Sequence, residues 1–177
     1  MDRREIERRH AAVDNALRRR GLTSVDVAGD GNCAFRAAAY LLDGNESGHA
    51  SLRQRVASHI EKDGLILGGI TDVSPDDGKS FADHVRDLRT DRHPVGQDAL
   101  IALAAVCGRD VTIFMADVEP LTISRPVSSS DPRPLRLAFY EPGHYRAVVP
   151  VTDKITVNSQ ATGASFNSVN SCRPPAN

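Results

Sequence analysis

The sequence predicts an α+β fold in which a small, mostly antiparallel sheet is flanked by helices. Three observations support this prediction. Apolar residues recur at helical spacing up to residue 107, short β-branched and aromatic runs follow from residue 111, and the turn EPG at 141–143 separates the last two runs. A chain of 177 residues is long enough to bury the core of one such domain.

Five helices are expected, each from apolar residues spaced three or four positions apart. Gly21 ends the first helix, and Asn32 is placed to cap the second. In the third helix the face that carries Leu52 is expected to be buried, while Arg53 and Arg55 are expected to turn outward. The expected helices cover residues 2–20, 33–42, 48–62, 80–90 and 96–107.

Four strands are expected, because alternating or β-branched runs lie between segments rich in turn-forming residues. The turn EPG is short enough to join the last two strands as an antiparallel hairpin. Residues 63–79 and 127–134, which are rich in Gly, Asp, Ser and Pro, are expected to be loops. The expected strands cover residues 24–28, 111–115, 135–140 and 145–149.

The domain organisation follows from these elements and from composition. Residues 1–21 are expected to form an N-terminal helix that packs on the domain, and residues 22–152 are expected to form the domain itself. Residues 153–177 are rich in Ser, Asn, Thr, Gly and Pro and hold few apolar residues. A polar, disordered tail is therefore expected there.

Charge and cysteine usage exclude several classes of protein. A net charge of −1 gives no electrostatic reason to bind nucleic acid or a membrane surface, and the charged N-terminus has no apolar stretch typical of a secretory signal. The three cysteines, at unrelated spacings, argue against a disulfide framework and favour a reducing, cytoplasmic setting. Because no CxxC or HxxxH spacing is present, no metal or other cofactor is expected.

Cys33 follows the turn GDGN and opens an apolar helix, which is a position suited to a thiol nucleophile. The positive end of the helix dipole favours the thiolate, the reactive form of cysteine. Backbone N–H groups at the start of a helix have no intrahelical acceptor, so those of Asp30, Gly31, Asn32 and Cys33 are candidates to stabilise an oxyanion. A cysteine at a helix start can equally be a small core residue.

A thiol nucleophile also needs a base, and His144 is the best placed of the six histidines. Four of the others lie on expected helices, and His93 precedes a proline in a loop. His144 alone follows a tight turn and opens an expected strand, where a rigid backbone would fix its ring. A strand histidine with a purely structural role fits the same pattern.

Four segments resemble the ovarian tumour (OTU) family of cysteine peptidases, in the order in which that family has them. GDGNCAFRAAAYLLDG resembles the nucleophile motif, and LAFYEPGHYRAVVP resembles the closing hairpin with its His-Tyr pair. HASLRQRVASHI and DALIALAAVCGRDVTIF resemble the segments between them. The resemblance spans roughly residues 22–150, which would then be an OTU-like catalytic domain, and it implies a papain-like OTU fold.

The resemblance implies a thiol-dependent deubiquitinase, which hydrolyses isopeptide bonds at the C-terminus of ubiquitin or a ubiquitin-like modifier through a thioester intermediate. It carries over Cys33 as the nucleophile, His144 as the general base and Asp30 as the third active-site position. The implied partners are conjugates of ubiquitin or a ubiquitin-like protein. They would be met in the cytoplasm or, for a viral or bacterial effector, in the host cytosol.

Two departures from the family pattern leave alternatives open. Many members have Asp or Asn two residues after the histidine, but this chain has Arg146, which cannot accept a hydrogen bond. The site is then either a Cys–His dyad or one that uses another acid, for which Asp26 is the candidate; Asp26 can equally be a solvated strand residue. The segment 95–100 also lacks the tryptophan that relatives commonly carry there. The alternatives to an active deubiquitinase are a catalytically weak or inactive OTU-like domain that binds ubiquitin, and a viral or effector polyprotein protease.

Overall fold

The structure is a computed structural model that describes residues 1–63, 80–125 and 131–151. Within these ranges it contains five helices and one five-stranded sheet, so the predicted α+β class is confirmed. The predicted tail at 153–177 and nearly all of the predicted loop at 63–79 lie outside the described residues.

All five predicted helices are present, and their ends agree with the sequence to within about two residues. Their apolar faces are buried where the spacing predicts, for example at Val13 and Leu17 in the first helix and Val85 and Leu88 in the fourth. No helix in the described part of the chain is long and apolar enough to span a membrane. The helices are α1 (Arg3–Arg18), α2 (Cys33–Asp43), α3 (His49–Asp63), α4 (Phe81–Arg89) and α5 (Gln97–Cys107).

The sheet has the strand order β1-β5-β4-β2-β3. Three of its four strand pairs are antiparallel and the β2–β4 pair is parallel, which confirms a mostly antiparallel sheet. β3 was not expected from the sequence, because three largely exposed residues at an edge carry no readable alternation. The strands are β1 (Leu22–Val25), β2 (Val111–Phe114), β3 (Leu121–Ile123), β4 (Leu135–Tyr140) and β5 (His144–Pro150).

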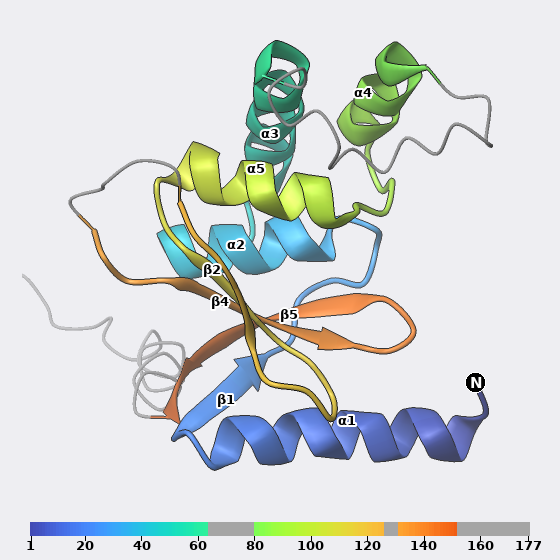
Figure 1. The fold of residues 1–177 in the computed structure, drawn as a ribbon, viewed down its shortest axis with the longest axis vertical. Helices are drawn as coiled ribbons and strands as arrows, with labels where there is room; N and C mark the ends of the chain where they lie inside the picture. The colour runs from blue at the N-terminus through green and yellow to red at the C-terminus, as the bar shows by residue number, and fades with distance from the viewer. Residues whose placement is uncertain (64–79, 126–130, 152–177) are drawn as a thin grey trace, which may run out of the picture.

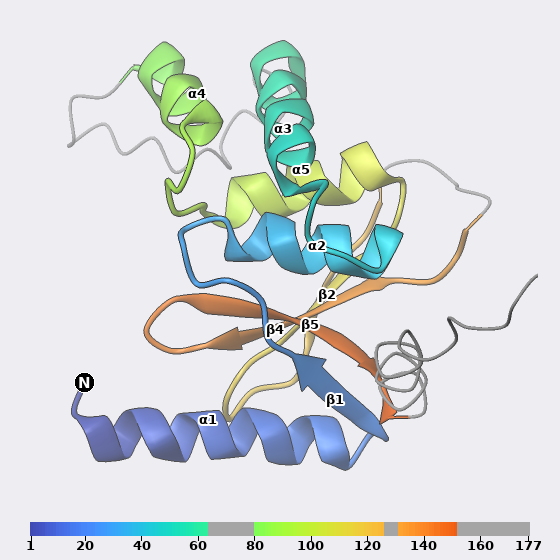
Figure 2. The ribbon, with the colours of Figure 1, turned by 180° about the vertical axis from the view of Figure 1, so that it is seen from behind.

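The sheet lies between two helical layers, as Figures 1 and 2 show. α2 and α5 cover one face, with α3 and α4 stacked beyond them, and α1 runs across the opposite face. The core divides in the same way. The larger cluster joins α2, α3 and α5 to one face of the sheet, and a smaller cluster packs Val13 and Leu17 of α1 against Tyr140 and Val148 on the other face.

Two connections bring the predicted functional residues to one end of the sheet. The segment after β1 leads directly to the first residue of α2, which is Cys33. The β4–β5 hairpin turns through three residues, with Tyr140 paired to His144 and the Gly143 N–H donating to the Tyr140 carbonyl at 3.1 Å. The Glu141–Pro142 peptide bond in this turn is cis. Because β5 pairs with β1 on one side and with β4 on the other, the hairpin turn and the segment after β1 meet.

Candidate active site

Cys33 faces the start of β5. Its side chain is buried, with 8% of the residue exposed, and the Tyr145 backbone N–H donates to its Sγ at 3.4 Å. The same sulfur lies 4.0 Å from the Gly143 carbonyl oxygen. These two contacts come from the residues on either side of His144, so the structure brings the predicted nucleophile and the predicted base together. The Tyr145 N–H contact, which places a backbone donor on the sulfur, has no signal in the sequence.

The His144 ring is held by a carboxylate on one side and lies against the chain before Cys33 on the other. Its Nε2 is 2.9 Å from Asp26 Oδ1. Its Nδ1 and Cε1 would each lie 3.6 Å from a β-carbon placed on Gly29, so that edge of the ring faces the segment that leads to Cys33. With Nε2 occupied by Asp26, Nδ1 is the nitrogen left to exchange a proton with a thiol.

Asp26 therefore contacts the histidine, and among the described residues it is the acid that does so. Its Oδ1 also accepts the Val27 N–H at 3.1 Å and lies 3.2 Å from Arg146 Nε. The hydrogen bond to His144, together with the positive charge of Arg146, lowers the pKa of Asp26. Of the two interpretations that the sequence leaves open, the geometry fits a histidine-orienting acid rather than a purely solvated residue.

Asp30 contacts the loop and not the histidine. Its two carboxylate oxygens accept from Arg36 Nε at 3.0 Å and from an Arg36 terminal nitrogen at 2.7 Å. This pairing holds the pKa of Asp30 well below its usual range. In the described part of the chain the Asp30 side chain contacts neither Cys33 nor His144, so the geometry makes it a residue that positions the loop 29–32 and not one that touches reacting atoms.

The expected set of oxyanion donors changes in the structure. The Asn32 N–H donates to Asp30 Oδ1 at 3.1 Å, so in this structure it is engaged within the loop. The carboxylate of Asp30 accepts this N–H in an Asx-type turn. The rule that amides at a helix start lack an intrahelical acceptor does not predict such a side-chain acceptor. The N–H groups of Asp30, Gly31 and Cys33 have no acceptor among the described residues and remain available.

Asn32 was expected to cap α2, and this expectation was wrong for its side chain. It occupies the N-cap position but makes no side-chain cap hydrogen bond. Its amide nitrogen instead donates to Asp91 Oδ1 at 2.9 Å, and its Oδ1 accepts from Arg53 Nε at 3.0 Å. The amide is only 2% exposed, so it joins the nucleophile loop to the chain around residue 91.

Arg53 was expected to face outward and is instead 2% exposed. Besides Asn32, it donates to the carbonyl oxygens of Gly31 at 2.9 Å, His93 at 2.7 Å and Leu88 at 2.8 Å. These acceptors offset the cost of burying the guanidinium, although burial still lowers the pKa of Arg53. Helical periodicity identifies apolar faces and therefore missed a charged side chain buried among carbonyl groups. Arg55 is exposed, as predicted.

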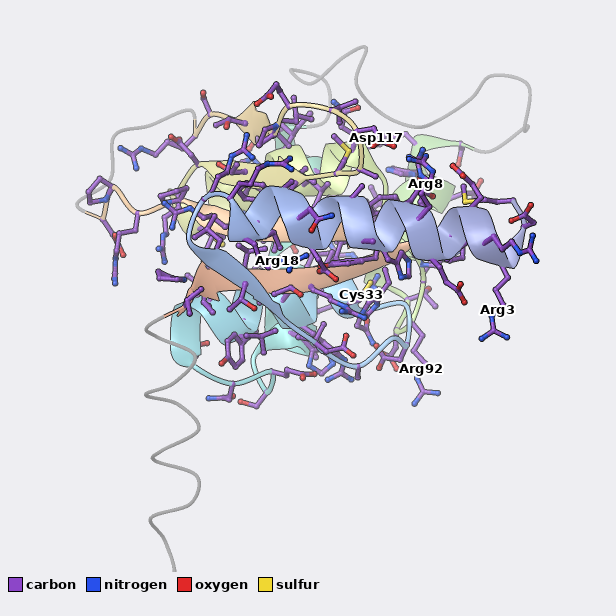
Figure 3. The ribbon with its side chains drawn as sticks, turned by 90° about the horizontal axis from the view of Figure 1, so that it is seen from below. Arg3, Arg8, Arg18, Cys33, Arg92 and Asp117 are labelled. Carbon is purple, nitrogen blue, oxygen red and sulfur yellow. The ribbon has the colours of Figure 1, made fainter. Side chains whose placement is uncertain are left out.

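Gly31 allows the loop to approach the chain at Arg92. Its φ is +81°, and a β-carbon there would lie 1.9 Å from the Arg92 carbonyl oxygen. No other residue fits without moving one of the two segments. Figure 3 looks past α1 from below and shows Cys33 and Arg92 on the same side of that helix.

These residues border an open cleft of about 490 Å³. The cleft is lined by Asp26, Val27, Gly29, Gly31, Cys33, Pro142, Gly143, His144 and Arg146. Within the described ranges, no group of three or more His, Cys, Asp or Glu side chains is arranged to hold a metal ion. A thiol, a base, an orienting acid and free backbone donors are the groups that nucleophilic acyl transfer uses.

Comparisons with known proteins identify relatives of this chain. No family model matches it. It is 29% identical over 157 residues to the OTU domain-containing protein 3 of Mus musculus, covering 88% of this chain and 37% of that protein. It is 25% identical over 164 residues to the OVARIAN TUMOR DOMAIN-containing deubiquitinating enzyme 6 of Arabidopsis thaliana, covering 93% of this chain and 30% of that protein. The chain thus spans about a third of the length of these curated relatives.

Solved structures show the same fold. The OTU domain of OTUD1 superposes with a TM-score of 0.70 at 18% identity, covering 84% of this chain and 99% of that one. An ovarian tumor domain in complex with ubiquitin superposes with a TM-score of 0.57 at 15% identity, covering 82% and 90%. The resemblance found in the sequence is thereby confirmed: this chain has the OTU fold, and its relatives in sequence and in structure are OTU-domain proteins.

Proposed function

We propose that this chain is a cysteine-type deubiquitinase that hydrolyses the isopeptide bond at the C-terminus of ubiquitin or a ubiquitin-like modifier. The observation that carries the proposal is the assembly of Cys33, His144 and Asp26 at one end of the sheet, beside an open cleft. Support for the substrate comes from the relatives, since one is named a deubiquitinating enzyme and one structural neighbour is an OTU domain bound to ubiquitin.

In the proposed first step, His144 Nδ1 takes the Cys33 proton and the thiolate attacks the carbonyl carbon of the C-terminal glycine of the modifier. Asp26 holds Nε2 and stabilises the imidazolium that forms. The N–H groups of Gly31 and Cys33, with that of Asp30 nearby, stabilise the oxyanion. Loss of one such donor typically costs on the order of 10²–10³ in rate.

The intermediate then collapses. The isopeptide C–N bond breaks, and the imidazolium of His144 gives its proton to the departing lysine amine, leaving a thioester between Cys33 and the modifier. His144 next takes a proton from water, which attacks the thioester carbonyl. The C–S bond breaks, the modifier leaves with a free carboxylate, and the proton returns to the sulfur. No redox partner enters this sequence.

Ubiquitin conjugates are accordingly the proposed partners, and the cytosol is the proposed location. Asp26 at the histidine also answers the objection raised by Arg146, since the ring does not lack an acceptor. This weakens the reason for preferring the inactive, ubiquitin-binding alternative that the sequence leaves open.

A ubiquitin probe with a C-terminal electrophile tests the proposal. We expect a covalent adduct with the wild type and with Cys107→Ala, because Cys107 lies outside the cleft, and none with Cys33→Ala. A panel of di-ubiquitins should be cleaved by the wild type, and His144→Ala should be slower by at least about a hundredfold. Binding of the probe without an adduct would contradict the proposal and support the inactive alternative.

A further inference from the structure

We propose that Arg146 is a positioning residue that holds the Asp26 carboxylate against the His144 ring and is itself held by the Tyr140 ring. The inference rests on the proposed function for its catalytic meaning. Arg146 cannot replace the missing acceptor after the histidine, because a guanidinium only donates. It instead acts on the acid that reaches the ring from β1.

Strand register places these groups on one face of the sheet. His144 and Arg146 are two residues apart on β5, and alternate residues of a strand point to the same side. Tyr140 of β4 lies directly opposite His144. Continuing the β1–β5 register by one residue beyond Val25, which pairs with Ala147, sets Asp26 beside Arg146. Backbone pairing therefore fixes Tyr140, His144 and Arg146 on one face of the sheet, and Asp26 follows directly after the last paired residue of β1.

Arg146 makes two contacts that fit this role. Its Nε lies 3.2 Å from Asp26 Oδ1, an ion pair without the alignment of a directed hydrogen bond. Its guanidinium carbon lies 4.3 Å from the centroid of the Tyr140 ring, within the range of a cation–π interaction. The side chain is 29% exposed, so both contacts are partly shielded from solvent.

Tyr140 provides a fixed surface for that stacking. The residue is 1% exposed, and its hydroxyl lies 2.6 Å from Asp14 Oδ1 and 3.1 Å from Ser24 Oγ. The ring of His10 meets it edge-on, with centroids 5.2 Å apart. Groups of α1 and β1, as well as its own strand, therefore hold the ring beside Arg146.

Asp26 needs such support. Its side chain is 67% exposed, and it lies just beyond the end of β1, where no further strand pairing restrains it. An exposed carboxylate is readily solvated and contributes little through ion pairing unless its geometry is fixed. The Val27 N–H, Arg146 and His144 all converge on Oδ1, so Arg146 supplies one of three restraints on the atom that binds the ring.

The position of Arg146 on the cleft wall suggests a competing role, direct contact with the substrate. A second competing role is purely electrostatic, since a positive charge near His144 disfavours the imidazolium. These roles can be told apart by the direction in which removal of Arg146 changes the reactivity of Cys33, and by whether that change depends on Asp26. If charge alone mattered, removal of Arg146 would raise the reactivity of Cys33 at low pH. If positioning matters, removal would lower it.

The test measures the rate at which iodoacetamide alkylates Cys33 between pH 5.5 and 8, because this readout needs no ubiquitin. We expect Arg146→Met to lower that rate at pH 6 by roughly tenfold, as a displaced ring no longer stabilises the thiolate–imidazolium pair. Arg136→Met, which removes an arginine from β4, is the matched control and should behave as wild type. Faster alkylation in Arg146→Met, or no change, would overturn the proposal.

Coupling to Asp26 completes the test. We expect Cys33 to be alkylated slowly in Asp26→Ala and no more slowly in the double variant Asp26→Ala/Arg146→Met, because Arg146 acts through Asp26. Additive losses would overturn positioning through Asp26 and indicate that Arg146 affects Cys33 and His144 independently of that carboxylate. Should Arg146→Met not fold, Arg146→Lys serves instead, since an ammonium does not reproduce the planar stacking; wild-type rates in that variant would count against the proposal.

The same variants separate this inference from the proposed function. If no ubiquitin substrate is cleaved but Cys33 alkylation depends on Arg146 and Asp26 as described, positioning stands and the deubiquitinase assignment fails. If di-ubiquitin is cleaved and the Arg146 variants match the wild type, the assignment stands and positioning fails.

Discussion

Among single residues, the two described cysteines differ most in what they can do. Cys33 receives a backbone N–H on its sulfur and borders the cleft. Cys107 ends α5, and burial raises its pKa to about 11. The thiolate is the reactive form, and at pH 7 roughly one Cys107 thiol in 10⁴ would carry the charge, by the ordinary titration relation.

This difference predicts selective chemistry. Limited iodoacetamide at pH 7 should modify Cys33 and leave Cys107 unmodified in the native protein, whereas both should react after denaturation. Peptide mass spectrometry measures each site. Equal modification of both cysteines in the native state would show that the burial of Cys107 does not protect it.

Gly31 supports a second prediction, with Gly44 as its control. Both have positive φ, +81° and +76°, so an alanine at either carries a left-handed penalty of roughly 1–2 kcal/mol. Only at Gly31 would the new β-carbon meet backbone, 1.9 Å from the Arg92 carbonyl oxygen; at Gly44 nothing lies within 4 Å. We expect Gly44→Ala to keep Cys33 alkylation and lose a little stability.

Gly31→Ala should instead lose both stability and Cys33 reactivity, because the loop that carries the nucleophile must separate from the chain at residue 92. Denaturant unfolding and the alkylation rate, measured on the same preparations, distinguish the two variants. Equal behaviour of Gly31→Ala and Gly44→Ala would contradict the importance of this close approach.

Helices and strands were predictable from the sequence where a single segment carries its own pattern. Apolar spacing predicted α1 to α5, and the turns before Cys33 and His144 pointed to these two residues as candidates for the site. The structure adds contacts between segments far apart in the chain. Arg53 reaches carbonyl groups in three other segments, and Asp26 meets a histidine 118 positions later. No local pattern encodes such contacts. For this reason the sequence placed Arg53 on the surface and could not decide whether Asp26 contacts the histidine or is a solvated strand residue.

α1 illustrates the same point, because its role extends beyond core packing. Arg9 pairs with the Glu141 carboxylate at 3.0 Å, and His10 Nε2 lies 2.6 Å from the Glu141 carbonyl oxygen. Glu141 lies in the turn that leads to His144, and Figure 1 shows the N-terminal half of α1 running beneath the β4–β5 hairpin. The helix therefore holds the turn from which the proposed base projects.

Weakening this contact should loosen the hairpin. We expect the double variant Arg9→Ala/His10→Ala to exchange amide hydrogens faster at residues 140–146 and to alkylate Cys33 more slowly. Arg3→Ala, which removes an exposed pair with Glu7 on the same helix, is the control and should change neither measurement. Unchanged exchange at the hairpin in the double variant would show that α1 does not restrain it.

Across the whole molecule, the site lies at the end of the sheet where β1 leads to α2 and β5 begins. Cys33 comes from the layer of α2, while His144, Arg146 and Tyr140 point to the face that α1 covers. Asp30, paired with Arg36, fixes the loop that joins β1 of the sheet to α2. Its carboxylate is 22% exposed, so this ion pair is less screened than the surface pairs elsewhere on the chain.

The depressed pKa of Asp30 predicts how stability depends on pH. Because its folded pKa lies below the ordinary value of 3.8, the unfolded chain binds the proton more readily. The stabilisation is therefore complete above about pH 5 and is lost progressively as pH falls below about 4 toward the folded pKa. The thermal midpoint of the wild type should be flat near neutrality and fall on this acid limb. The midpoint of Asp30→Asn should start lower at pH 7, since Arg36 keeps only Glu46 of its two carboxylate partners, and it should depend less on pH below 5. Glu7→Gln, which alters an exposed pair with Arg3, is the control and should keep the acid limb of the wild type. An Asp30→Asn limb as steep as that of the wild type would place the dominant acid-sensitive group elsewhere.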